Sequence, residues 1–190
     1  MTKRRIVFLP GKKVNLCLLE RKDIRQITHW INDSDVTQYL VSYRPMLAEE
    51  EEGWYEKLVG SEKNFVFRLE SNDSDRTFFG TMGIHGIDYR QGTAGTGALI
   101  GNPSYRGKWF GTDAKMTLLY WAFTELNLRK VCSHVLATNP RSKRYLEKTG
   151  YREVGCYRKH VLHKGEFVDE YIMEVFKEDF LKIWRLYNKR

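Results

Sequence analysis

Residues 96–114 read TGALIGNPSYRGKWFGTDA. The apolar run ALIG at 98–101 predicts a short buried strand, which the following Asn-Pro pair ends. The loop after it contains Gly107 and Gly111 and opens directly into a helix. Glycine lets a backbone approach a ligand closely, and the unpaired N–H groups of a first helical turn attract anions. The stretch therefore predicts an anion-binding site between a strand and a helix.

Two basic residues, Arg106 and Lys108, belong to this loop. A pyrophosphate would suit it, because two adjacent phosphates can use several amides and a cation at once. A tight turn with solvated basic side chains would contain the same residue types. The elements that follow the loop favour the anion site over the plain turn.

The helix after the loop has one apolar face over residues 109 to about 126. The residues on that face are Phe110, Ala114, Leu118, Trp121, Ala122 and Leu126. A β-rich run at 130–137 follows, which makes a strand–helix–strand unit with an expected parallel, right-handed crossover. Asn139 can then cap a short helix that Gly150 ends.

The remaining elements complete one expected domain over residues 1–190. Apolar alternation predicts further strands at 13–20, 65–69, 77–89, 151–162 and 166–176. Helical spacing predicts helices from an N-cap at Asp23 to residue 31, from 47 to 59, and in an amphipathic tail after 176. A glycine-rich turn is expected at 90–97, and the glutamates at 49–52 are expected on a solvated helix face.

The chain has 190 residues, of which 42% are hydrophobic and 29% charged, a composition typical of globular proteins. Its formal net charge of +8 attracts anions, and nucleic acid, acidic lipid and phosphorylated small molecules all qualify. Its basic residues are dispersed along the chain and no nucleic-acid-binding motif is present, which disfavours nucleic acid.

Apolar runs end well before the roughly 20 residues of a membrane span, and the first apolar run is too short for a secretory signal. Cys17, Cys132 and Cys156 are odd in number and widely spaced, so neither a disulfide framework nor a metal site is indicated. We therefore expect a cytoplasmic protein that binds no metal and contacts no membrane.

Four segments together resemble the GNAT acetyltransferases, in particular the branch of ribosomal-protein N-terminal and spermidine acetyltransferases. RGKWFG at 106–111 matches the family's acetyl-CoA loop, (Q/R)xxGx(G/A), except that Trp109 stands at its middle glycine. NPRSKRYLEKTGY at 139–151 matches the motif that follows in the family. HWINDSDV at 29–36 is similar to the substrate-side helices, and KHVLHKGEFVDEYIMEV at 159–175 to the final hairpin.

The resemblance implies a mixed α/β (α+β) fold: a mostly antiparallel, twisted central sheet with one parallel, split pair of strands and helices on both faces. It implies acetyl-CoA as co-substrate, whose arm would pair with the split strand and whose thioester carbonyl would meet a backbone N–H near Leu99 or Ile100. The residues it assigns to acetyl-CoA are Leu99, Ile100, Gly101, Arg106, Gly107, Lys108, Trp109, Phe110, Gly111, Thr112, Asn139 and Ser142.

The implied reaction is direct attack of an amine on the thioester, which requires removal of a proton because a free alkylamine is protonated near pH 7. The family's usual glutamate base aligns with Gly95, and its usual tyrosine acid aligns with Leu146. Tyr145 lies about 100° away on the helix and is expected to be a packing residue. The candidates left are His85, Asp88 and Ser142, together with the carboxylates Asp33 and Asp169. His85 and Ser142 also suit a structural role.

The acceptor stays open among a protein N-terminus, a polyamine and an amino sugar. Five residues lie in segments that cover the acceptor side in the family: Trp30, Asp33, Tyr39, Tyr43 and Trp54. They could form a pocket for a cationic substrate, or they could be core aromatics and solvated carboxylates. The missing glutamate and tyrosine also allow a catalytically idle acetyl-CoA sensor, and the charge allows a nucleic-acid-binding module. Monomer and homodimer are both compatible with the sequence.

Overall fold

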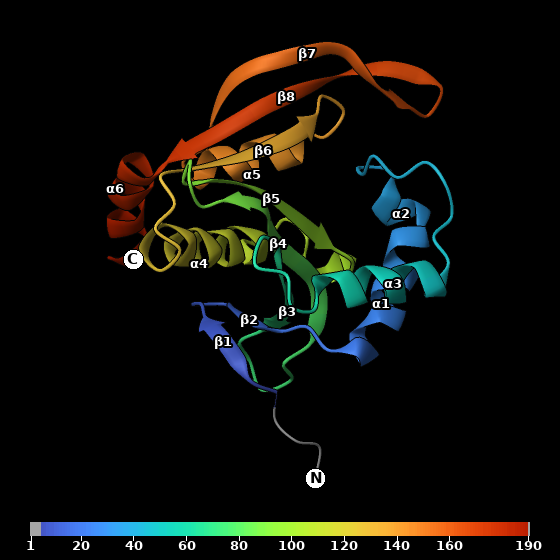
Figure 1. The fold of residues 1–190 in the computed structure, drawn as a ribbon, viewed down its shortest axis with the longest axis horizontal. Helices are drawn as coiled ribbons and strands as arrows, with labels where there is room; N and C mark the ends of the chain where they lie inside the picture. The colour runs from blue at the N-terminus through green and yellow to red at the C-terminus, as the bar shows by residue number, and fades with distance from the viewer. Residues whose placement is uncertain (1–4, 190) are drawn as a thin grey trace.

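The structure is a computed structural model that describes residues 5–189 (Figure 1). Its strands are β1 (Val7–Pro10), β2 (Val14–Leu18), β3 (Phe65–Ser71), β4 (Phe78–Asp88), β5 (Thr93–Ile100), β6 (Lys130–Leu136), β7 (Arg152–His163) and β8 (Glu166–Phe176). Its α-helices are α1 (Ile24–Asn32), α2 (Ser34–Thr37), α3 (Ala48–Leu58), α4 (Phe110–Thr124), α5 (Pro140–Lys148) and α6 (Lys177–Asn188). Two 3-10 turns, η1 (Arg21–Asp23) and η2 (Pro103–Tyr105), complete the elements. None of the helices in this part of the chain is long and apolar enough to cross a membrane.

The described strands form one eight-stranded sheet in the order β1-β2-β3-β4-β5-β6-β8-β7. Neighbouring strands are antiparallel except β5 and β6, which run parallel and pair only over 93–95 and 130–132. This is the pair that the strand–helix–strand unit predicts, with α4 as the crossover. The long β7–β8 hairpin arches over the end of the sheet toward α2 (Figure 1), where His163 Nε2 lies 2.9 Å from the carbonyl oxygen of Gln38.

Helices cover both faces of the sheet, as the resemblance implies. On one face Phe67 of β3 packs edge-on against Trp121 of α4, with ring centroids 5.6 Å apart. The next residue, Arg68, points to the other face because side chains alternate along a strand. It stacks on Phe78, which in turn contacts Trp30 of α1. The helices α5 and α6 lie beside α4 (Figure 1).

A buried carboxylate in the first turn of α4 holds the N-terminal hairpin. Asp113 accepts the backbone N–H groups of Lys12, Lys13 and Val14 at 3.2, 2.7 and 2.9 Å, and the hydroxyl of Tyr187 on α6. Burial and this carboxylate raise the pKa of Tyr187, so the hydroxyl stays a donor. Asp113 thereby joins the β1–β2 turn, α4 and α6 at one point.

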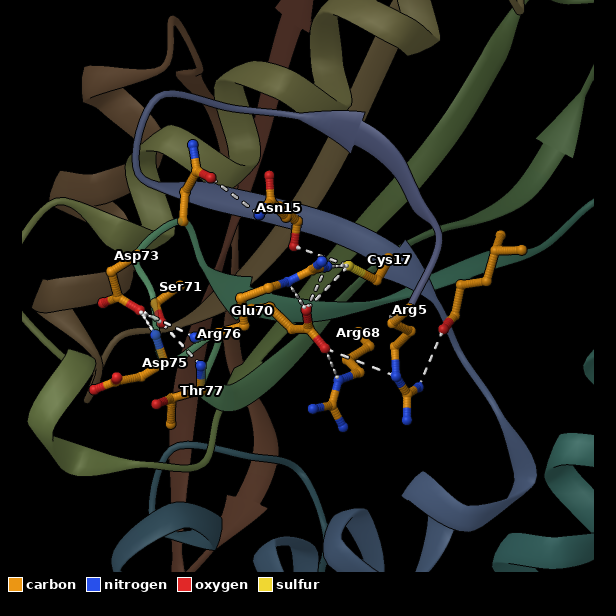
Figure 2. A network of polar contacts seen from close by, with 12 residues as sticks. Arg5, Asn15, Cys17, Arg68, Glu70, Ser71, Asp73, Asp75, Arg76 and Thr77 are labelled. Atoms are coloured by element: carbon orange, nitrogen blue, oxygen red, sulfur yellow. Dashed lines mark hydrogen bonds and ion pairs between the residues drawn. The ribbon is translucent and has the colours of Figure 1, made fainter. Parts of the chain in front are cut away.

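A second polar cluster, on the α1 side of β3, is centred on Glu70 (Figure 2). Its carboxylate accepts hydrogen bonds from Arg68 Nε at 2.8 Å and Arg76 Nε at 2.9 Å, and Arg5 Nε lies 3.7 Å away. The thiol of Cys17 is 3.5 Å from the same carboxylate. Burial, with the charge of Glu70, raises the pKa of Cys17 to about 11, so this cysteine is an unreactive thiol that helps to pack the cluster.

The strand expected at 98–101 is longer and less buried than the sequence indicates. It begins at Thr93, inside the stretch predicted as a glycine-rich turn, and only the turn up to Gly92, with φ of 62°, remains irregular. Ala98 is exposed, because beyond residue 95 β6 no longer pairs with β5 and leaves that edge of the strand open.

Three smaller expectations are also corrected. Asp23 does not cap α1 with its side chain, because the carboxylate binds the guanidinium groups of Arg5 and Arg68. Glu51 is buried, at 7% exposure, rather than solvated, and burial raises its pKa. The strand β1 was not anticipated, because a four-residue apolar run carries too little periodicity to identify a strand.

Replacing Asp113 with alanine should lower the free energy of unfolding by about 2–4 kcal/mol, because three N–H groups around a buried turn lose their acceptor. Urea unfolding followed by circular dichroism measures the change. Asp75→Ala, in an exposed turn, is the matched control and should stay within ~0.5 kcal/mol of the wild type. Equal effects of the two substitutions would contradict the role given to Asp113.

Candidate active site

The parallel strands β5 and β6 part immediately after their three paired residues. At the vertex of this split, the hydroxyl of Ser133 donates to the carbonyl of Thr96 at 3.2 Å. The hydroxyl of Thr96 in turn lies 2.8 Å from that of Tyr151. Beyond the vertex β6 pairs with β8, and residues 97–100 of β5 keep a strand partner only on the β4 side. These contacts fix where the split begins.

A cavity of about 420 Å³ occupies the split. Two strands form its sides: residues 96–100 of β5 and 133–136 of β6. The loop at 105–111, Thr112 and Lys115 of α4, and the cap and one face of α5 close one end. Residues 36 and 39–41 and Glu170 of β8 complete the wall. The free strand edge, a helix N-terminus and the cap of a second helix therefore all face one cavity.

Most of the residues predicted to bind acetyl-CoA line this cavity. They are Leu99, Ile100, Arg106, Gly107, Trp109, Gly111, Thr112, Asn139 and Ser142. Three others lie outside its walls. Gly101 is packed under Trp30, since a Cβ there would lie 1.9 Å from the ring, Phe110 packs against Tyr105, and Lys108 is exposed in the loop.

The loop at 106–111 keeps its amides available. In the stretch from Arg106 to Thr112, only the first amide is recorded as donating to another residue of the described chain, to the carbonyl of Pro103 at 3.0 Å. Gly111 has open space where a side chain would be. Six consecutive N–H groups at the start of α4 are therefore free for an anionic ligand, as the sequence predicts.

Trp109 adopts the backbone conformation expected of the glycine it replaces. Its φ is 72°, in the left-handed region, which costs a non-glycine residue about 1–2 kcal/mol. The side chain is half exposed, and the ammonium of Lys148 lies 4.5 Å from its ring centroid. The indole thus has a partner on α5, and the shape of the loop survives the substitution.

The positive charge of the site is arranged differently from the prediction. The guanidinium of Arg106 donates to the carbonyls of Ile100 and Gly101 at 3.0 and 3.1 Å, which fastens the loop to the end of β5. Arg141 and Arg144 of α5 line the cavity and have no ion-pair partner among residues 5–189. The cations open to a phosphate therefore come from α5.

The predicted catalytic residue His85 does not line the cavity but lies behind its β5 wall. It is the cross-strand partner of Gly95, and its Nε2 is 3.7 Å from the position of a Cβ on Gly97, an exposed residue of the cavity wall. Burial, with the charge of Lys115, lowers the pKa of His85 below its ordinary 6.5. The imidazole is therefore neutral at pH 7 and able to accept a proton.

Two further predicted catalytic residues differ in position. Asp88 lies at the closed end of the split, where its carboxylate accepts the N–H of Gln91 at 2.9 Å and shapes the β4–β5 turn. It does not line the cavity. Ser142 does line it, in the first turn of α5, where its N–H donates to the capping side chain of Asn139 at 3.0 Å.

Of the five predicted acceptor residues, Tyr39 lines the cavity and the other four do not. Trp30 is buried against Phe78, the carboxylate of Asp33 caps α2 by accepting the N–H of Asp35, and Tyr43 is 89% exposed. Their role stays a prediction. The same region also reaches the cavity through Val36, Leu40 and Val41.

Several charged or titratable residues of the cavity were missed, among them Arg141 and Arg144 of α5. Glu170 and His134 lie together, with Oε2 and Nδ1 3.2 Å apart, on strands whose pairing only the fold reveals. Lys115 is 1% exposed, and burial lowers its pKa to about 7. Its sequence signal was visible: a lysine among the apolar residues of α4, one turn after Gly111.

Comparison with known proteins agrees with this geometry. A family model described as an acetyltransferase (GNAT) domain matches residues 13–152. A spermidine N(1)-acetyltransferase of Vibrio cholerae is 26% identical over 90% of this chain and 97% of its own. An uncharacterized prophage-derived N-acetyltransferase of Bacillus subtilis, YokL, is 26% identical over 92% and 96%. The crystal structure of the Vibrio cholerae spermidine N-acetyltransferase with CoA and spermine superposes with a TM-score of 0.82, covering 89% of this chain and 98% of that one.

The fold and these comparisons define an acetyltransferase. The chain belongs to the GNAT acetyltransferase family. It is an N-acetyltransferase that uses acetyl-CoA.

Replacing Gly111 with tryptophan should abolish binding of coenzyme A, because the indole would fill the space in front of the free amides. A Cβ at this position meets no protein atom within 4 Å, so the substitution is expected to leave the fold intact. Isothermal titration with coenzyme A measures the affinity. Gly53→Trp, at another helical glycine with open space around it, should bind normally. Unchanged affinity of the Gly111 variant would count against the phosphate loop.

Proposed function

We propose that the chain transfers the acetyl group of acetyl-CoA to a primary amine of a small molecule that carries a second positive charge, as polyamines do. The observation that carries this proposal is the cavity in the split. The amides at 107–112 and the cations of α5 lie on one part of its wall, and a carboxylate lies on another. Among the described residues that line it, Glu170 is the one acidic side chain. The names of the relatives, a spermidine N(1)-acetyltransferase and a structure containing spermine, support the same class of acceptor.

The acetyl-CoA arm pairs with the open edge of β5 as an added strand, and its pyrophosphate lies on the amides at 107–112. A backbone N–H at Leu99 or Ile100 then polarises the thioester carbonyl. Asn139 and Ser142, at the start of α5, border the arm on its other side. This arrangement leaves the wall formed by residues 39–41 and Glu170 for the acceptor.

The acceptor nitrogen attacks the carbonyl carbon, and the tetrahedral intermediate expels a thiolate. His85 takes the proton of the nitrogen, directly or through one water, because its neutral imidazole lies beside Gly97 on the acceptor face of β5. The glutamate that serves this purpose in the family would stand at Gly95, across the strand pair from His85. The base thus comes from the neighbouring strand.

An acetyl-CoA consumption assay tests the acceptor. Spermidine and diamines should be acetylated, and monoamines, amino sugars and peptide N-termini should be poorer acceptors. Glu170→Gln should raise KM for a diamine several-fold and leave KM for a monoamine nearly unchanged, because it removes only the partner of the second charge. Preference for peptides would overturn the choice of acceptor. Stabilisation by coenzyme A without turnover on any amine would indicate an acetyl-CoA sensor.

Substituting His85 with glutamine should lower kcat about 100-fold, since the size is similar but no proton can be accepted. The acid limb of the pH profile gives the sharper readout. In the wild type, kcat should fall as His85 becomes protonated below pH ~6.5, and this inflection should vanish in the variant. An unchanged acid limb would assign the inflection to another group.

A further inference from the structure

Lys115 lies beneath the vertex of the split. The helix α4 begins at the mouth of the cavity and runs back toward the vertex, so Lys115, one turn after Gly111, is about 6 Å closer to it. Both residues line the cavity, together with Thr96 and Ser133 at the vertex. The ammonium is 5.8 Å from the ring centroid of Tyr145 on α5.

The Lys115 side chain is buried without any polar partner in the described chain. It is 1% exposed and has no recorded hydrogen bond or ion pair with residues 5–189. Every fully buried side-chain nitrogen or oxygen in that part of the chain has a hydrogen-bond partner, so the Lys115 ammonium must be open to the cavity. Burying an isolated cation costs stability, and such a group is kept at functional sites. Its missing partner points to a ligand in the cavity.

We propose that Lys115 lies against the sulfur of bound acetyl-CoA and donates its proton to the thiolate as it leaves. This inference rests on the proposed function. The carbon–nitrogen bond forms, the carbon–sulfur bond breaks, and its electron pair goes to sulfur, which takes the proton from Lys115. His85 then holds the proton lost by the amine, and Lys115 is neutral. His85 releases its proton to solvent and Lys115 takes one up, which returns both residues to their starting states.

No other side chain near the vertex is as good a proton donor. Leu146 stands where the family's tyrosine would be, and it is 1% exposed in the hydrophobic core. Burial raises the pKa of Tyr145 well above 10, which makes its hydroxyl a weaker acid than usual. Burial has the opposite effect on Lys115, whose pKa of about 7 makes the ammonium a stronger acid than a thiol with a pKa of ~8.5. An exposed lysine, at ~10.4, would be a poor donor to the same thiolate.

The charged groups around Lys115 are consistent with this direction of transfer. The titratable groups that line the cavity with Lys115 are Tyr39, Tyr105, Arg106, His134, Arg141, Arg144, Tyr145, Lys148 and Glu170. Tyr151 lies at the vertex beside Thr96, and His85 of β4 lies behind Gly97 of the cavity wall. Burial, with the charge of Lys115, lowers the pKa of His85. The proposed acid and base belong to α4 and β4.

The proposal is tested by titrating the thiol of bound coenzyme A, followed by the ultraviolet absorbance of the thiolate. Lys115 and the bound thiol titrate as a coupled pair, so thiolate should begin to form near pH 7, where part of the Lys115 ammonium is still charged. Lys115→Met should move this onset to higher pH, toward the free thiol value of ~8.5, because no ammonium is then present at any pH. Lys182→Met, an exposed lysine on α6, is the control and should leave it unchanged. Equal thiol pKa values in the wild type and Lys115→Met would overturn the proposal.

Lys115→Arg separates charge from proton donation. Its guanidinium stays protonated, so the bound thiol should remain acidic while kcat falls about tenfold or more, as in Lys115→Met. A wild-type kcat in Lys115→Met would overturn the proton-donor role. The melting temperature of Lys115→Met should rise, because an apolar chain of similar length replaces an isolated buried cation. The thiol titration needs no acceptor amine, so it can fail or succeed independently of the acetylation assay.

Discussion

The fold's function depends on one constraint: β5 and β6 pair for three residues and then separate. β6 pairs with β8 along its whole length, on the side away from β5. Where β5 and β6 stop pairing, the hydroxyl of Ser133 donates a hydrogen bond to the carbonyl of Thr96. The remaining edge of β5 is exposed backbone, which can accept an added strand. The crossover helix α4 returns from the mouth of this split, so its free amides and the open edge face the same cavity.

The chain lacks the family's usual acid and base in their usual places, yet residues close in space can supply both functions. The base position falls on Gly95, which has no side chain, and the cross-strand neighbour His85 lies on the same face. The acid position falls on Leu146, which is buried in the core, and Lys115 of α4 faces the cavity instead. The catalytic task depends on position relative to the thioester, and neighbouring elements can reach that position.

Much of the architecture could be predicted from residue patterns. The caps at Asn139 and Gly150 and the β7–β8 hairpin have local signals, and they are present. The predicted helix α4 is present too, but it is not amphipathic: β-strands and the helices α5 and α6 surround it, so residues on nearly all its sides are buried. The length of β5 was not predictable from the sequence. Its glycines are typical of a turn, and pairing with β4 is what gives residues 93–97 a strand conformation. Arg106 looked like a phosphate ligand in the sequence, whereas the structure uses it to bind two carbonyls of β5.

The sequence by itself determined the strand–loop–helix that presents free amides, because glycine placement and helix capping act within a few residues of each other. It also determined the family, through motifs that are contiguous in the chain. Only the tertiary structure decided which side chains meet in the cavity: α5 supplies the cations, and Glu170 and His134 come together across paired strands. The burial of Lys115 was decided there as well, since its lowered pKa arises from the apolar surroundings that several distant segments build around one ammonium.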